Sequence, residues 1–108
     1  MKTSLAPTVE SQRLLTLVHE KRPMIHAVMQ KYGAVNPRIF GSVVQGTAGP
    51  DSDVDILVDE VKAPGLLALA GLTCELEELM QTKVDVVLKD TIKHNRRALI
   101  LNSKMVKL

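Results

Sequence analysis

Two acidic residues, Asp53 and Asp55, open the strand predicted at Asp53 to Asp59. Acidic residues are depleted from strands, and the period of two puts the apolar side chains of this segment on one face. The two aspartates share the other face, about 7 Å apart along the chain. Carboxylates held this close repel each other unless a cation lies between them, so the segment predicts a site for a cation such as Mg²⁺.

A glycine-serine pair, Gly41 and Ser42, follows the strand predicted at Asn36 to Phe40. Glycine lets the backbone approach a phosphate closely, and serine offers a hydroxyl and an amide as donors. If this pair serves the same site as Asp53, the two strands must run antiparallel. Asp85 joins the same face if its own strand lies beside the second one. Three carboxylates around such a turn outline a two-metal site for phosphoryl transfer.

The remaining pattern predicts helices and further strands that alternate along the chain. The helices are expected at residues 8–20, 23–32, 66–80 and 91–101, and the other strands at 84–88 and 104–108. The apolar stripe of the third helix begins with Leu66 and is expected to pack on the core, with an interface to another molecule as the second interpretation. We therefore predict one domain over residues 1–108 of α/β (α+β) class, with a small mixed sheet of three to four strands packed with helices.

The composition indicates the cellular compartment in which the chain is expected to function. No apolar stretch approaches the roughly 20 residues of a membrane helix, and the first residues lack the apolar run of a signal peptide. The single cysteine of the chain, Cys74, cannot form an intramolecular disulfide, which suits a reducing compartment. We expect a cytoplasmic protein with no membrane partner.

Charge is uneven along the chain. The net charge is only +2, but Lys83 to Leu108 carries seven Lys and Arg against two Asp. This basic segment either meets phosphates or forms a solvated face. Aromatic residues make up only 2% of the chain, so few side chains are available to stack bases, which argues against a nucleic-acid partner.

The spacing of these residues resembles a known family. The motif begins with Gly41-Ser42 and continues, after ten residues, with Asp53-Val54-Asp55; a later acid lies in the segment KVDVVL. This motif is similar to that of the minimal nucleotidyltransferases of the DNA polymerase β superfamily. The resemblance spans nearly the whole chain and implies a polymerase β-like nucleotidyltransferase fold. It also implies two Mg²⁺ ions as cofactors and ATP, a nucleoside triphosphate, as substrate.

The resemblance assigns a role to each matching residue. Ser42, with the backbone of Gly41, would hold the terminal phosphates of the triphosphate. Asp53 and Asp55 would bind the two Mg²⁺ ions. Asp85 would bind the catalytic metal and help to deprotonate the attacking hydroxyl. These roles define the predicted catalytic and metal-binding residues.

The resemblance also implies a partner. Minimal nucleotidyltransferases of this kind are commonly encoded beside a helical protein of the HEPN ribonuclease class and act as its antitoxin. They transfer AMP from ATP to a tyrosine near the ribonuclease site. The chain is therefore expected to be a Mg²⁺-dependent protein adenylyltransferase, forming a hetero-oligomer with a HEPN-type toxin.

One departure from the family pattern keeps two alternatives open. Many relatives carry arginines just after the glycine-serine pair, where this chain has Val43 and Gln45. The departure removes cationic contacts to the triphosphate, so an antitoxin that neutralises its partner by binding alone is the second hypothesis. A small-molecule nucleotidyltransferase is the third, although such enzymes are generally longer. The basic residues that could replace the missing charge are Arg38, Lys93, Arg96 and Arg97.

Overall fold

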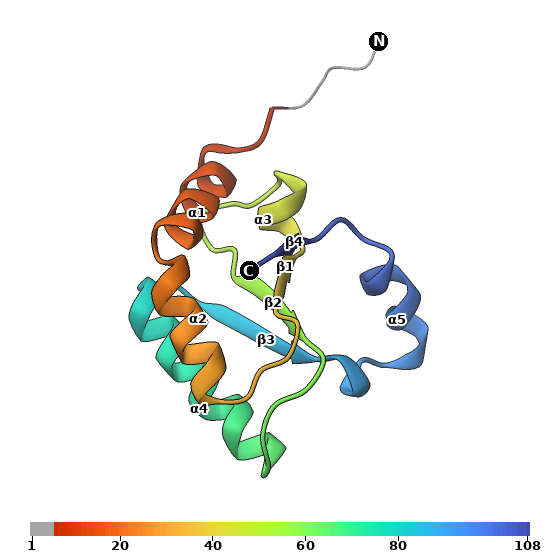
Figure 1. Cartoon of the computed structure of the whole chain (residues 1–108). Coiled ribbons are helices and arrows are strands. Elements are labelled where there is room, and N and C mark those ends of the chain that lie inside the picture. The colour runs from red at the N-terminus through yellow and green to blue at the C-terminus, as the bar shows by residue number, and fades with distance from the viewer. Residues whose placement is uncertain (1–5) are drawn as a thin grey trace.

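A sheet of four strands in the order β3-β2-β1-β4 organises the chain, which a computed structural model describes over residues 6–108 (Figure 1). The strands are β1 (Arg38–Phe40), β2 (Val54–Val58), β3 (Val84–Leu88) and β4 (Val106–Lys107). β1 is antiparallel to both β2 and β4, whereas β2 and β3 are parallel. The mixed sheet predicted from the sequence is confirmed. The structure also meets the two conditions for a shared site, because the first two strands are antiparallel and the third lies beside the second.

The helices follow the apolar periodicity of the sequence. They are α1 (Val9–Glu20), α2 (Arg22–Lys31), α3 (Ser42–Gln45), α4 (Gly65–Met80) and α5 (His94–Leu101), with a 3₁₀ turn, η1 (Lys89–Thr91). α1 begins where the Thr8 hydroxyl accepts a hydrogen bond from the amide of Ser11, and α2 begins with Pro23 in its first turn. Within residues 6–108, no helix combines the length and apolarity needed to cross a membrane.

The main core lies between one face of the sheet and three helices. Figure 1 shows α1, α2 and α4 on the same side of the sheet. Alternate residues of the central strand β2 point into this layer, because Val54, Ile56 and Val58 are all buried there. Leu72 and Leu76 of α4 meet them as fully buried side chains. The apolar face of β2 is thereby fixed toward the helices, and its other residues must face the opposite side.

A smaller cluster lies on the second face of the sheet. Its buried members are Phe40, Leu57 and Ile92, with Ile100 and Met105 packed against them. Figure 1 shows α5 beside this face, away from α1, α2 and α4. A single short helix meets this second face, whereas three helices cover the first.

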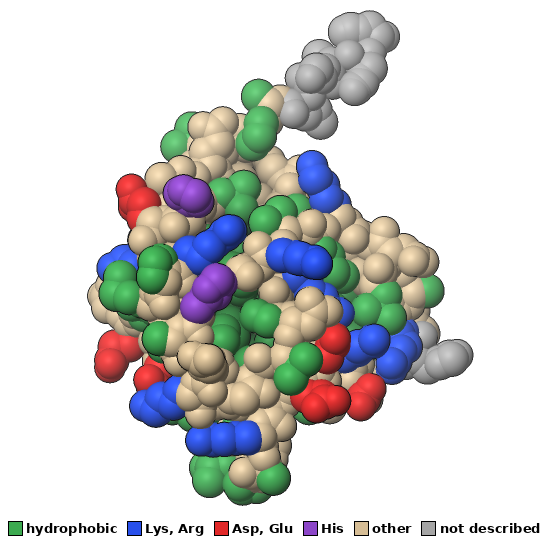
Figure 2. Space-filling model, in the orientation of Figure 1, with side chains coloured by type: hydrophobic (Ala, Val, Ile, Leu, Met, Phe, Trp, Pro, Cys, Tyr) green, Lys and Arg blue, Asp and Glu red, His purple; other side chains and the backbone are tan. Residues whose placement is uncertain are grey.

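Leu66 corrects one expectation from the sequence. It is 84% exposed, and its neighbour Leu67 is 70% exposed, so the apolar stripe of α4 does not reach the core in its first turn. Buried positions of α4 begin only at Ala68. Hydrophobic side chains are visible at the lower end of the molecule, where α4 begins (Figure 2). Helical period alone does not show where the neighbouring sheet ends.

An ion pair between Arg38 and Asp59 lies at the C-terminal end of β2. The Arg38 guanidinium donates to the Asp59 carboxylate at 2.7 Å and to the backbone oxygen of Asn36 at 2.7 Å. Arg38 is buried, and its hydrogen bond is the main cause that lowers the pKa of Asp59. The bond links the start of β1 to the residue that follows β2.

Asp59→Asn should lower the free energy of unfolding by about 2 kcal/mol at pH 7, because Arg38 loses its counter-ion while buried. The folded-state pKa of Asp59 lies below its unfolded value of 3.8. The stabilisation is therefore present above that pH and is lost as the pH falls through the folded-state pKa. Urea unfolding of both proteins at pH 7 and at about pH 3 tests this, and an equal difference at the two pH values would contradict it.

Candidate active site

A row of three side chains crosses the second face of the sheet. In the strand register, Phe40 of β1 lies opposite Asp55 of β2, and Asp55 lies opposite Asp85 of β3. Directly paired residues of adjacent strands point to the same face. The strand pairing thus brings together two aspartates that are 30 positions apart in the chain, on the face where the core is smaller.

Asp53 completes a cluster of three aspartates. It lies one residue before β2 and is partly exposed, as is Asp55. The pKa of Asp55 is raised to about 6, chiefly by burial and then by the negative charges of Asp85 and Asp53. The three predicted carboxylates therefore lie within electrostatic reach of one another, and the central one is costly to ionise in this fold without a compensating cation.

Gly41 lies directly against this cluster. Its φ of 80° falls in the left-handed region that favours glycine, and a Cβ built on it would overlap the carboxylate of Asp55. Ser42 follows as the first residue of α3. The predicted glycine-serine pair and the predicted aspartates are thus neighbours in space.

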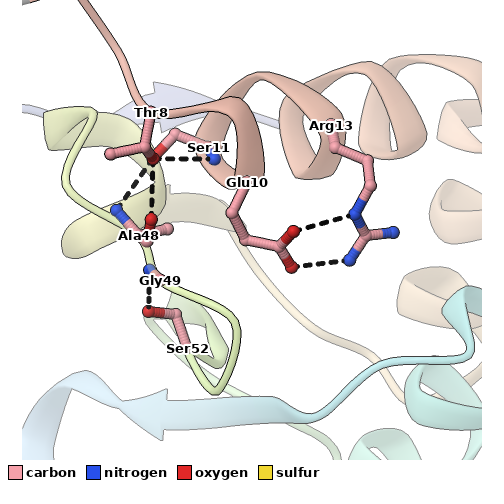
Figure 3. A network of polar contacts seen from close by, with 7 residues as sticks. All are labelled: Thr8, Glu10, Ser11, Arg13, Ala48, Gly49 and Ser52. Carbon is pink, nitrogen blue, oxygen red and sulfur yellow. Dashed lines mark hydrogen bonds and ion pairs between the residues drawn. The ribbon is translucent and has the colours of Figure 1, made fainter.

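The loop after this pair is tied to the start of α1, as Figure 3 shows. The hydroxyl of Ser11, which is fully buried, accepts from the amide of Ala48 at 2.9 Å and donates to the backbone oxygen of Ser42 at 3.3 Å. The Thr8 hydroxyl lies 2.7 Å from the backbone oxygen of Ala48. The side chains of Thr8, which caps α1, and of Ser11 thereby hold α3 and the loop that follows it.

A cleft of about 310 Å³ opens over Asp55 and Asp85, with α5 and the segment before it as its second wall. Its lining combines the acidic row with basic and apolar side chains, namely Phe40, Asp55, Asp85, Val87, Thr91, Ile92, Lys93, Arg96 and Ile100. An adjoining hollow shares Phe40, Asp55, Arg96 and Ile100 and adds Gly41 and Gln45. The sequence reasoning missed the apolar wall, because nothing in an apolar pattern distinguishes a residue of a cleft from a residue of the core.

The four basic candidates separate clearly in space. Arg96 lines both hollows and Lys93 lines the first. Arg97 faces Asp90 instead, with 3.7 Å between the charged atoms. Arg38 is engaged by Asp59. Only two of the four candidates therefore line the acidic cleft.

The two departures from the family pattern also differ. Val43 is fully buried in the main core, so its side chain packs among apolar residues. Gln45 is exposed and lines the second hollow. A neutral side chain therefore faces the cleft at position 45, whereas position 43 belongs to the core.

The donor set suits a hard cation. Asp53, Asp55 and Asp85 offer only oxygen atoms, and the raised pKa of Asp55 marks a carboxylate that a divalent cation would favour as the ionised form. Within residues 6–108 no group of three acidic, His or Cys side chains is arranged so that it could hold a metal ion by itself. Mg²⁺ is usually held by one or two carboxylates together with waters and substrate phosphates, so an open arrangement fits it.

Comparison with known proteins decides the family. Residues 24–107 match the family described as a nucleotidyltransferase domain. The chain belongs to this family. It is 37% identical over 86 residues to the protein adenylyltransferase MntA of Thermococcus cleftensis, covering 80% of this chain and 82% of the relative. The alignment takes in most of both proteins.

Solved structures agree with this nucleotidyltransferase fold. A structure described as a minimal nucleotidyltransferase superimposes with a TM-score of 0.72 at 34% identity, covering 88% of this chain and 95% of that one. A toxin-antitoxin crystal structure with AMP-PNP shares the fold with a TM-score of 0.51 at 20% identity, covering 90% of this chain and 72% of that one. The predicted polymerase β-like fold of this nucleotidyltransferase is confirmed.

Asp55→Asn should stabilise the metal-free nucleotidyltransferase by about 1 kcal/mol at pH 8, after discounting for solvent screening. The substitution removes a partly buried charge that two neighbouring aspartates destabilise. Urea unfolding in the presence of a chelator measures the effect. Asp51→Asn, in an exposed turn, is the matched control and should change nothing. An Asp55→Asn variant less stable than the wild type would contradict the electrostatic interpretation.

Gly41→Ala should lower the free energy of unfolding by about 2 kcal/mol, because the new Cβ is strained at positive φ and meets the Asp55 carboxylate. Gly49→Ala is the control, since a Cβ there meets no atom within 4 Å. Thermal and urea denaturation of the two variants would separate them. Equal stability of both variants would show that Gly41 is not held against Asp55.

Proposed function

We propose that this nucleotidyltransferase transfers AMP from ATP to the hydroxyl of a tyrosine in a HEPN-type ribonuclease toxin. By this transfer it acts as the antitoxin. The observation that carries the proposal is the placement of Asp55 opposite Asp85 with Gly41 against the same carboxylate. In this proposal the carboxylates would bind a cation directly beside the point where the Gly41 backbone would approach a phosphate. The likeness to a protein adenylyltransferase supports AMP as the transferred group, and a fold shared with a toxin-antitoxin structure is consistent with a toxin as partner.

The carboxylates and the glycine-serine pair divide the work. Asp53, Asp55 and Asp85 would hold Mg²⁺, which supplies charge neutralisation at the phosphates when bound. Gly41 and Ser42 contact the terminal phosphates through backbone and hydroxyl donors. The acceptor oxygen forms a bond to the α-phosphorus, the bond from that phosphorus to the bridging oxygen of pyrophosphate breaks, and the hydroxyl proton passes toward Asp85. The products are pyrophosphate and the acceptor carrying AMP.

The acceptor comes from another molecule in this scheme. The one tyrosine of the chain is Tyr32, whose hydroxyl donates to Glu75 of α4. Tyr32 packs against the main core, on the helix side of the sheet, whereas Asp55 faces the other side. The cleft over the aspartates is open and bounded by one short helix, so a protruding side chain of a partner can reach the α-phosphate.

A binding antitoxin without catalysis is the second candidate, and Gln45 is the observation that favours it. This side chain lines the hollow beside Gly41 but carries no charge to hold a triphosphate. Under this alternative the aspartates are dispensable for neutralisation, and contact between the two proteins alone blocks the toxin.

The experiment is intact-mass spectrometry of a HEPN-type toxin that forms a complex with this chain, after incubation with the chain, Mg²⁺ and each nucleoside triphosphate in turn. A mass gain of one or more AMP groups with ATP is expected. Asp53→Asn should reduce the transfer rate at least about a thousandfold, because a metal ligand is lost. The exposed Asp51→Asn variant should transfer at the wild-type rate, and removal of Mg²⁺ by a chelator should stop transfer.

Two results would contradict the proposal in different ways. Transfer that persists in Asp53→Asn would show that the carboxylates are wrongly assigned. No mass gain with any nucleotide, together with a stable complex and a neutralised toxin, would establish the binding antitoxin instead.

A further inference from the structure

We propose that Arg96 of α5, with Lys93 beside it, binds the triphosphate of the nucleotide and supplies the positive charge that the glycine-serine loop lacks. The inference rests on the proposed function and assigns part of the nucleotide subsite to the wall opposite the aspartates. Neither residue lies in the segment that carries Gly41, Ser42, Asp53 and Asp55.

The position of Arg96 is the first argument. Its side chain lines both hollows that contain Asp55, and one of them also contains Gly41. Lys93 lines the hollow that contains Asp85. Arg96 is thus the basic residue that borders the aspartate cluster and the glycine turn together, which is where a bound triphosphate must lie.

The charge of the loop is the second argument. No Lys or Arg occurs from Gly41 to Asp53. Val43 is buried in the core and Gln45, which lines the hollow with Arg96, is neutral. Three aspartates near a triphosphate leave a large negative charge, and cations that approach from the opposite wall would offset it.

The availability of Arg96 is the third argument. Among the side chains described in residues 6–108, Arg96 forms no ion pair, whereas the adjacent Arg97 faces Asp90. The Arg96 guanidinium is therefore not engaged in an ion pair with a described carboxylate, and it has the planar fork that suits two phosphate oxygens at once.

The test compares Arg96→Ala with Arg97→Ala, a change of the same kind at the next position of α5. Isothermal titration calorimetry with Mg²⁺-ATP, Mg²⁺-AMP and inorganic tripolyphosphate gives the dissociation constants. Arg96→Ala should weaken Mg²⁺-ATP and tripolyphosphate about tenfold or more and Mg²⁺-AMP much less. Arg97→Ala should change each less than about twofold, and Arg96→Lys should restore part of the affinity because it keeps the charge without the fork.

The outcomes separate the two proposals. Equal ATP affinities for the Arg96→Ala and Arg97→Ala variants, with unchanged thermal unfolding, would overturn the role of Arg96 while the proposed function stands. Arg96-dependent binding of tripolyphosphate without binding of any nucleotide would support the anion site and overturn the proposed transfer of AMP. If the wild type bound neither a nucleotide nor tripolyphosphate, both the role of Arg96 and the proposed transfer of AMP would be overturned.

Discussion

The pairing of β2 with a neighbour on each side is the constraint on which the site depends. Val54, Ile56 and Val58 are buried against the helices, so the residues between them must face the other way. A slip of one residue in this strand would turn Asp55 into the main core and three apolar side chains toward the cleft. The apolar burial of β2 thus determines where its carboxylate points, and the parallel pairing with β3 then places Asp85 beside it.

Two features of the candidate site lower the free energy of unfolding of the metal-free chain. Asp55 lies partly buried between two like charges, and Gly41 adopts a positive φ where a Cβ has no room. Each feature is unfavourable for a metal-free chain, and the main core offsets them from the other face of the sheet. Local features that lower stability in this way are expected where a protein binds a charged ligand. A cation bound between the carboxylates would offset their mutual repulsion.

Local pattern predicted the sheet and the aspartate cluster because both follow from period and spacing. The alternation around Asp55 shows which face carries the acid, and a shared site for Gly41 and Asp53 requires the antiparallel pairing that the structure contains. Pattern could not predict which cations face the cleft. Arg38 and Arg96 look alike in the sequence, yet one pairs with Asp59 and the other lines the cleft. The prediction that Leu66 packs on the core is wrong for the same reason. Its exposure depends on how far α4 extends beyond the edge of the sheet, which the sequence pattern does not show.

The cleft joins two parts of the chain that differ in how strongly the fold fixes them. The aspartates and the glycine turn belong to the sheet and to a loop that Ser11 holds through two hydrogen bonds. The opposite wall is α5, a helix of eight residues that packs against a small cluster around Phe40 and Ile92. Substitutions on the exposed side of such a helix disturb little of the core. Under the proposed function, affinity for the phosphates could therefore change through α5 while the carboxylates remain in place, which would separate the binding of the nucleotide from the chemistry performed on it.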